Sequence, residues 1–443
     1  MNFEALKHRL PTIKKLIATL LLAVGCTAAG AQNGFNLPYS QFGMGESASP
    51  YNTPLGGGIG GTLYAARGYN FINPYNPASY AAVEQENLVL DIGLSLQRYR
   101  LSDNSNSMSD FDGNLAYLAL AFPLTGWWKS AVGLTPCSET EYESIHLAPF
   151  SDGTQVKTVY DGTGGIYRVF WGNGFNVGKQ LTVGFNINYL YGDINRGLKY
   201  DILGSDTNHY SDSRRLKNTH ISGLTFDIGA QCLLEIDEKR QLTLGLTLEL
   251  PRKMTTRDTA WIYTLVEGTE NANSIVDSSL YESSVTRPLG IGLGVAYEYD
   301  RLWRLAADLH YAPWHGMKYE EGLTPPVFPQ SGVDYTANYT AALSVAWLGN
   351  TAASNYWKRI GISAGLHYER GRLGLLLDGS SERIDEWGGG MNFSFPIRKG
   401  RSKIQLSMGY SSLGGKDLLR VECYTFGLTL SSCEQWFFKR KYN

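Results

Sequence analysis

The chain has 443 residues, of which 39 are Lys or Arg and 41 are Asp or Glu, and its formal net charge is −2. This balance, without a basic stripe along the chain, excludes nucleic acid as an expected partner. The mean hydropathy of −0.22 fits a soluble protein, but it also fits a membrane β-barrel, whose polar inner face dilutes the apolar signal.

Residues 1–31 have the features of a secretory signal peptide. Four basic residues precede the apolar run 16–24, and the small residues Ala29-Gly30-Ala31 follow it. The run is too short to cross a bilayer as a helix, which requires about 20 residues. We therefore expect residues 1–31 to be removed, with lipid attachment at Cys26 as the alternative.

Residues 32–87 lack any strand pattern and are rich in Gly, Pro, Asn and Tyr. The glycine run at 55–61 is not a phosphate-binding loop, because no Lys-Ser/Thr pair follows it. Aromatic and apolar residues embedded in the segment argue against a freely solvated tail. We expect the segment to lie as a plug inside a lumen.

From residue 88 to residue 443 the chain repeats segments of about ten residues that alternate between large apolar and small or polar side chains, as transmembrane β-strands do. One such segment carries Leu242, Leu244, Leu246, Leu248 and Leu250 on one face and Gln241, Thr243, Gly245, Thr247 and Glu249 on the other.

A soluble β-sandwich also alternates, but single hydrophobic cores stop growing near ~250 to 300 residues. A sandwich would also have to bury Asp91, Asp227 and Asp308 or leave one sheet face in contact with water. At about 25 residues per strand and connection there is room for about 14 strands, an even number as in bacterial barrels. The predicted fold is therefore all-β, a transmembrane antiparallel β-barrel over 88–443 with an N-terminal plug.

Aromatic residues are frequent, with 28 Tyr, 17 Phe and 10 Trp. Barrels carry aromatic girdles at both membrane interfaces. The Trp residues that we expect in these girdles are Trp127, Trp128, Trp171, Trp303, Trp314, Trp347 and Trp436.

Enzymatic, metal and cofactor chemistry is not expected. The chain has no Cys-x-x-Cys pair and no histidine at zinc spacing. His310 and His367 fall on lumen-facing positions instead of beside an outward serine, as an outer-membrane lipase would require. Cys423 and Cys433 could form a disulfide only if the chain turned back after Leu430.

The tripeptide Asn76-Pro77-Ala78, placed between the signal and the first strand, resembles the FadL family of outer-membrane transporters of hydrophobic compounds. The stretches 38–45 and 436–443 look like a divergent branch of that family. The resemblance implies that an N-terminal hatch containing Asn76, Pro77 and Ala78 blocks the lumen, and that the ligand leaves sideways through a kink in the third strand.

The stretch corresponding to that kink is 128–138, which contains Gly133 and Pro136. Because proline has no N–H to give to a neighbouring strand, we expect a bulge or a break at Pro136, which could open the wall. The alternative is that Pro136 only ends a strand.

The expected function is passive uptake of hydrophobic small molecules, such as long-chain fatty acids, across the outer membrane of a Gram-negative bacterium. The ligand would be captured at irregular external loops, expected at 138–165, 200–220, 255–288 and 317–334. Expected partners are the ligand, outer-membrane lipid and lipopolysaccharide. The alternative is a FadL-like barrel that serves as a partner or shuttle in outer-membrane protein secretion or assembly, with machinery proteins as partners.

Overall fold

The structure is a computed structural model of the chain. It describes residues 37–51, 61–102, 107–149, 155–203, 212–266, 272–316, 319–320, 333–377, 380–397, 401–415 and 418–435. The predicted signal peptide, most of the glycine run and Trp436 lie outside these residues.

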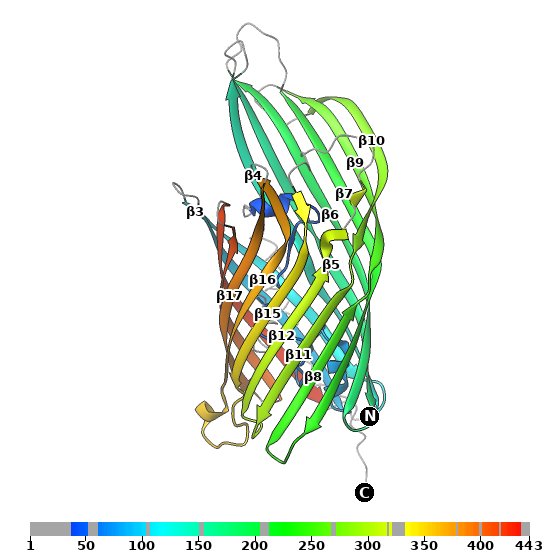
Figure 1. Cartoon of the computed structure of the whole chain (residues 1–443), viewed down its shortest axis with the longest axis vertical. Coiled ribbons are helices and arrows are strands. Elements are labelled where there is room, and N and C mark those ends of the chain that lie inside the picture. Colours follow the sequence, from blue (N-terminus) through cyan, green and yellow to red (C-terminus); the bar gives the residue numbers. More distant parts are fainter. Residues whose placement is uncertain are drawn as a thin grey trace, which may run out of the picture.

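The described residues form a single antiparallel sheet that closes on itself (Figure 1). Its strands are β1 (Glu46–Ser47), β2 (Asn87–Ser102), β3 (Ser107–Pro123), β4 (Trp128–Pro149), β5 (Gln155–Val177), β6 (Leu181–Leu203), β7 (Ser213–Glu235), β8 (Arg240–Glu249), β9 (Arg252–Leu265), β10 (Ala272–Arg287), β11 (Gly290–Tyr299), β12 (Trp303–Pro313), β13 (Tyr319–Glu320), β14 (Val333–Tyr335), β15 (Ala337–Trp347), β16 (Gly361–Leu377), β17 (Ser380–Ile397), β18 (Ser402–Gly414) and β19 (Arg420–Gln435).

These strands build a wall of fourteen, as the sequence predicted. β8 and β9 form one wall strand interrupted at Pro251, and β10 and β11 form another interrupted at Pro288, because proline cannot donate to the ladder. β14 continues into β15, while β1 and β13 are short additions. β19 pairs with β2 from Arg420–Ser102 to Gln435–Asn87 and so closes the cylinder.

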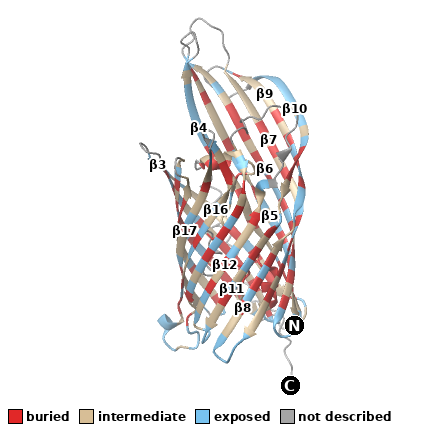
Figure 2. Ribbon diagram, in the orientation of Figure 1, coloured by how far each residue is buried: buried red, intermediate tan, exposed pale blue. Residues whose placement is uncertain are grey.

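The two faces of the wall differ as the alternation predicted (Figure 2). Leu244 and Leu293 face outward and are 42% and 49% exposed, whereas Thr243 and Gln231 face inward and are buried. An apolar exterior around a polar interior is the arrangement of a barrel embedded in lipid. The sandwich alternative, in which the apolar faces would pack together, is thereby excluded.

Some aromatic side chains lie at the ends of wall strands. Trp303, the first residue of β12, contacts Trp347, the last residue of β15, whereas Trp387 and Tyr410 contact each other within β17 and β18. For Trp314 the prediction was wrong, because its ring lies 4.9 Å from the Arg372 guanidinium and lines an internal cavity.

The wall is much taller on one side than on the other (Figure 1). β5, β6 and β7 each have 23 residues, whereas β12 and β15 have 11 each. The prediction of irregular loops at 138–165 and 255–288 was wrong over most of their length, since β4, β5, β9 and β10 run through them. Beyond the bilayer the outward face need not be apolar, so these strands lack the pattern that marks lipid-facing ones.

Residues 37–51 and 61–86, here called the N-terminal segment, contact inward-facing side chains of the wall. The segment contains two short 3-10 helices, η1 (Pro38–Gln41) and η2 (Pro77–Ala82), and the strand β1. Two further 3-10 helices are η3 (Trp314–Gly316) and η4 (Tyr356–Arg359). None of the helices in the described part of the chain is long and apolar enough to span a membrane.

Cys423 and Cys433 both lie in β19, ten positions apart along one extended strand, and each has a free thiol.

Candidate functional site

Two wall aspartates accept hydrogen bonds from the backbone of the N-terminal segment. Oδ2 of Asp308, on β12, accepts the N–H of Leu63 and, at 3.3 Å, that of Tyr64. Oδ2 of Asp91, on β2, accepts the N–H of Ile72 at 2.7 Å. Both aspartates are almost fully buried. Their carboxylate oxygens accept hydrogen bonds from backbone N–H groups that would otherwise be buried without partners.

The Asn-Pro-Ala motif forms the start of η2. Oδ1 of Asn76 accepts the N–H of Ala78 at 3.1 Å, which makes Asn76 the N-cap, and Pro77 occupies the first helical position. Nδ2 of Asn76 donates to the carbonyl of Tyr64 at 2.6 Å, so it also holds the preceding turn of the segment. The motif therefore has a structural role that its residue types explain.

The wall of β6 and β7 makes room for this motif with two glycines. A Cβ on Gly184 would lie 2.5 Å from the carbonyl oxygen of Pro77, and a Cβ on Gly229 would collide with Oδ1 of Asn76. These close approaches require glycine at both positions.

Further polar side chains of the wall bind the same segment. Nδ2 of Asn186 donates to the carbonyl of Pro74 at 2.9 Å, and Nε2 of Gln231 donates to that of Tyr64 at 3.1 Å. Sequence reasoning assigned these polar faces to a wet lumen and missed that they bind protein backbone. The signal available was the cluster of Asp, Asn and Gln on neighbouring strands.

The ladder between β3 and β4 is incomplete. Their pairing runs from Pro123–Lys129 to Leu118–Leu134 and stops there, although β4 continues to Pro149 and β3 begins at Ser107. Strand β4 has a register shift against β5 between Pro136 and Ser138. Pro136 thus lies at an irregularity just beyond the last β3–β4 pair.

Gly133 is in the final paired stretch, opposite Ala119. A Cβ at this position would lie 2.6 Å from the carbonyl oxygen of Leu118 and 2.6 Å from the ring of Phe170. Glycine therefore permits a close approach of β3 and β4 immediately before their ladder ends. The two residues singled out from the sequence, Gly133 and Pro136, flank the end of the ladder.

Part of the N-terminal segment takes the place of β3 beside β4. Glu46 is opposite Glu139 and Ser47 is opposite Ser138 in the β1–β4 pairing. The N–H of Ala48 donates to the carbonyl of Cys137 at 3.0 Å, which extends the contact by one residue.

Two internal cavities meet at β1. One, of about 220 Å³, lies against β2, β3 and β4 and is lined by Asn114, Leu115 and Pro136. The other, of about 250 Å³, is lined by Arg168 of β5, Glu249 of β8 and Arg287 of β10 among others. Glu46, Ser47, Ala48 and Ser49 line both cavities.

Charged side chains give the second cavity a mixed lining. The guanidinium of Arg287 forms ion pairs with Asp227, at 3.3 Å, and with Glu249. Arg168 donates from Nε to Oγ1 of Thr135 at 3.0 Å, and its guanidinium lies 5.7 Å from the ring centre of Tyr75. The cavity can therefore accommodate polar as well as apolar groups.

Glu46 is the titratable group of β1 and is half-buried. Burial, with Glu386 and Glu369 nearby, raises its pKa from 4.5 to about 7, although Arg372 acts in the opposite direction. Arg372 also holds this strand directly, since Nη2 donates to the carbonyl of Gly45 at 3.0 Å.

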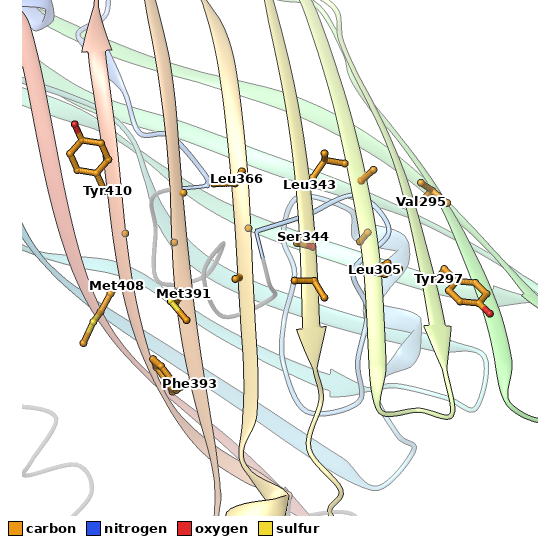
Figure 3. A pocket seen from close by; sticks show the side chains of 18 residues that line it. Val295, Tyr297, Leu305, Leu343, Ser344, Leu366, Met391, Phe393, Met408 and Tyr410 are labelled. Atoms are coloured by element: carbon orange, nitrogen blue, oxygen red, sulfur yellow. The ribbon is translucent and has the colours of Figure 1, made fainter.

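A third and larger hollow, of about 1190 Å³, lies on the outer wall (Figure 3). Outward side chains of β11, β12 and β15–β18 surround it, including Leu305, Leu343, Leu366 and Met391. The floor of the hollow includes Gly365, Gly389 and Gly390, which have no side chains to fill it. Since this surface faces lipid, we do not assign it to the internal site.

Catalytic patterns do not form a site in the described residues. Residues 361–365 read Gly-Ile-Ser-Ala-Gly, but they lie within the ladder of β16 instead of the strand-to-helix turn that a hydrolase nucleophile needs. The described part of the chain contains no group of three His, Cys, Asp or Glu that could hold a metal ion.

Solved outer-membrane channels share the fold. The CymD monoaromatic hydrocarbon channel has a TM-score of 0.52 and 14% identity, covering 88% of this chain and 100% of its own. A Pseudomonas aeruginosa FadL homologue has a TM-score of 0.53 and 12% identity, covering 91% and 100%. The Pseudomonas putida toluene transporter TodX has a TM-score of 0.50 and 14% identity, covering 88% and 99%.

At these identities the likeness establishes the fold, and it confirms the resemblance to FadL-type channels predicted from the sequence. The lipid-facing wall and this fold also confirm the predicted outer-membrane location. No curated protein matches the sequence significantly. The family model described as BamG matches residues 12–443, and the chain therefore belongs to the BamG family.

Proposed function

We propose that this protein is an outer-membrane channel for passive uptake of hydrophobic small molecules, with lateral exit between β3 and β4. The observation that carries the proposal is the incomplete β3–β4 ladder, which ends at Leu118–Leu134 beside the cavity lined by Leu115 and Pro136. A molecule leaving there enters the bilayer, where each buried CH₂ contributes about 0.8 kcal/mol. Apolar substrates such as long-chain fatty acids or small hydrocarbons therefore gain from this route, and ions do not.

The N-terminal segment acts as the hatch in this proposal, after removal of residues 1–31. Its contacts with Asp91, Asp308 and Asn186 support this role, because they hold backbone across the lumen of the barrel formed by 88–443. Asn76, Pro77 and Ala78 fix the turn of the hatch that packs on β6 and β7. A blocked axial path leaves the wall as the exit.

The test compares uptake of a fluorescent long-chain fatty acid and of a small polar dye by cells with and without the protein. Pro136→Val restores a backbone donor beside the ladder break and should reduce fatty-acid uptake several-fold. Pro149→Val, at the exposed upper end of the same strand, is the matched control and should leave uptake unchanged. Equal fatty-acid uptake by cells with and without the protein would refute the channel function.

The second candidate is a role as a partner in outer-membrane protein secretion or assembly, which the tall side of the wall favours. On β10, Ile275, Val276 and Leu280 are 69%, 63% and 67% exposed, beyond the part of the wall that faces lipid. One edge of β10 pairs with β9. Among the described residues, the other edge pairs only at Ser284 and Val285, which lie opposite residues of β13. An exposed apolar strand edge is a surface on which another chain can add a strand.

This candidate is tested by the migration of the gently solubilised protein on native gels. Leu280→Asp should release the protein from any larger assembly, whereas Ser278→Asp, on the same strand, adds the charge without removing an apolar contact. Migration as a free barrel in the unmodified protein would exclude the partner role.

A further inference from the structure

Strand β1 lies where the two internal cavities adjoin. Residues 46–49 line the cavity beside the β3–β4 break and also the mixed cavity of the lumen, as do Pro136 and Ser138 of β4, Glu386 and Leu413. Movement of β1 away from β4 would widen the connection between the two cavities beside the break in the wall.

The attachment of β1 to β4 is short. It consists of the two residue pairs Glu46–Glu139 and Ser47–Ser138 and the hydrogen bond from Ala48 to Cys137. Gly43 and Gly45, with φ of 58° and 84°, set the turn that leads into it. A two-residue strand has little ladder of its own, so the groups around it decide its stability.

Those groups form a charged ring around Glu46 that contains more carboxylates than cations. On β16 lie Glu369 and Arg372, on β17 lies Glu386, and Tyr39 faces Glu46 from η1. Nε2 of His367, on β16, is 3.3 Å from Oε1 of Glu386. Glu139, opposite Glu46, accepts from Nδ2 of Asn114 at 3.4 Å. An ionised Glu46 would therefore add a negative charge to a half-buried site that already holds Glu369 and Glu386.

We propose that β1 is a proton-dependent gate, held against β4 while Glu46 is protonated and released when Glu46 loses its proton. Release widens the connection between the lumen cavity and the cavity at the β3–β4 break. The consequence for uptake rests on the proposed function, whereas the movement of β1 does not.

The direction of the pH dependence of β1 docking follows from proton linkage. Because the pKa of Glu46 is raised from 4.5 to about 7 in the docked state, docking is strongest below pH 4.5, weakens as the pH rises toward 7, and stays weak above it. The gate is therefore more often open at neutral and alkaline pH than at acidic pH.

The movement of β1 is measured by labelling Thr140→Cys with a water-soluble maleimide. Thr140 is 1% exposed, and Gly45 covers its Oγ1. The rate is normalised at each pH to that of Ser354→Cys, an exposed site near η4, which corrects for the pH dependence of an accessible thiol's reactivity. Labelling of the unmodified chain, with its own cysteines, is subtracted.

We expect the normalised rate to rise at least tenfold between pH 5 and pH 8. Glu46→Gln should keep the low rate at pH 8, because a neutral amide does not ionise, while the exposed Glu235→Gln should follow the original profile. An unchanged rate across the range, or a Glu46→Gln protein that still responds to pH, would overturn the proposal.

Uptake provides a separate readout. A disulfide between Ser47→Cys and Ser138→Cys, which are partners in the β1–β4 pairing, should abolish uptake until a reductant is added. If labelling depends on pH through Glu46 but no variant takes up fatty acid, the gate stands and the transport function fails.

Discussion

Replacing Asp308 by Ala should loosen the N-terminal segment without dissolving the barrel. The substitution removes the acceptor of two buried backbone donors, the N–H groups of Leu63 and Tyr64. A buried donor left without a partner costs about 1–3 kcal/mol, so the two together destabilise the local structure by at least ~2 kcal/mol. The wall itself keeps its ladders on both sides of β12.

A local loss of ~2 kcal/mol raises the open population about 30-fold, since each 1.4 kcal/mol is a factor of ten. Hydrogen exchange of the protein in nanodiscs, followed by mass spectrometry, would report this as faster exchange of peptides covering residues 61–72. Asp308→Asn keeps an amide oxygen as an acceptor and should produce a smaller increase.

Asp300→Asn is the control, because Asp300 lies in the tight turn before β12 with φ of 54°, a conformation that asparagine also adopts. Its exchange profile should match that of the original protein. If residues 61–72 exchange at the original rate in Asp308→Ala, the wall aspartate does not anchor the segment and our account of the polar inner face is wrong.

Three further substitutions test the structure. Gly184→Val should destabilise the packing of η2 by a few kcal/mol, because its side chain would occupy the position of the Pro77 carbonyl. Faster proteolysis after residue 75 would reveal this loss, whereas unchanged resistance to proteolysis would contradict the contact. Gly133→Val should separate β3 from β4 at the Leu118 carbonyl and lower the temperature at which the barrel unfolds on a heated gel, whereas an unshifted band would argue against the close approach. Leu343→Arg places a charge on the lipid-facing wall and should lower the free energy of unfolding by about 2–4 kcal/mol. Urea titrations of the protein in lipid vesicles measure this energy, and an unchanged value would mean that this face does not contact the bilayer core.

Much of the wall was predictable because membrane and lumen act on alternate residues of every spanning strand. Leu242 to Leu250 and Leu88 to Leu96 carry that alternation plainly. The upper parts of β5, β6 and β9 escaped prediction because no lipid contacts them, so that polar side chains occur on both faces and the segments read as loops.

The site was predictable to a lesser degree. Asn76, Pro77 and Ala78 were found because the tripeptide and its position before the first strand resemble the FadL family, while their role as the N-terminal cap of η2 became visible only in the structure. The binding of segment backbone by Asp91, Asp308 and Gln231 was not, since it joins residues far apart in the sequence, such as Tyr64 and Gln231. The pairing of β1 with β4 was missed for the same reason, and because a two-residue strand leaves no periodic trace.

The unequal height of the wall sets how the mouth is approached. With β4–β7 and β9–β10 rising on one flank and β12 and β15–β18 ending lower, the rim of the barrel is oblique (Figure 1). Under the uptake proposed above, a small molecule on the low flank would cross a shorter stretch of outer wall to reach the opening than one on the raised flank.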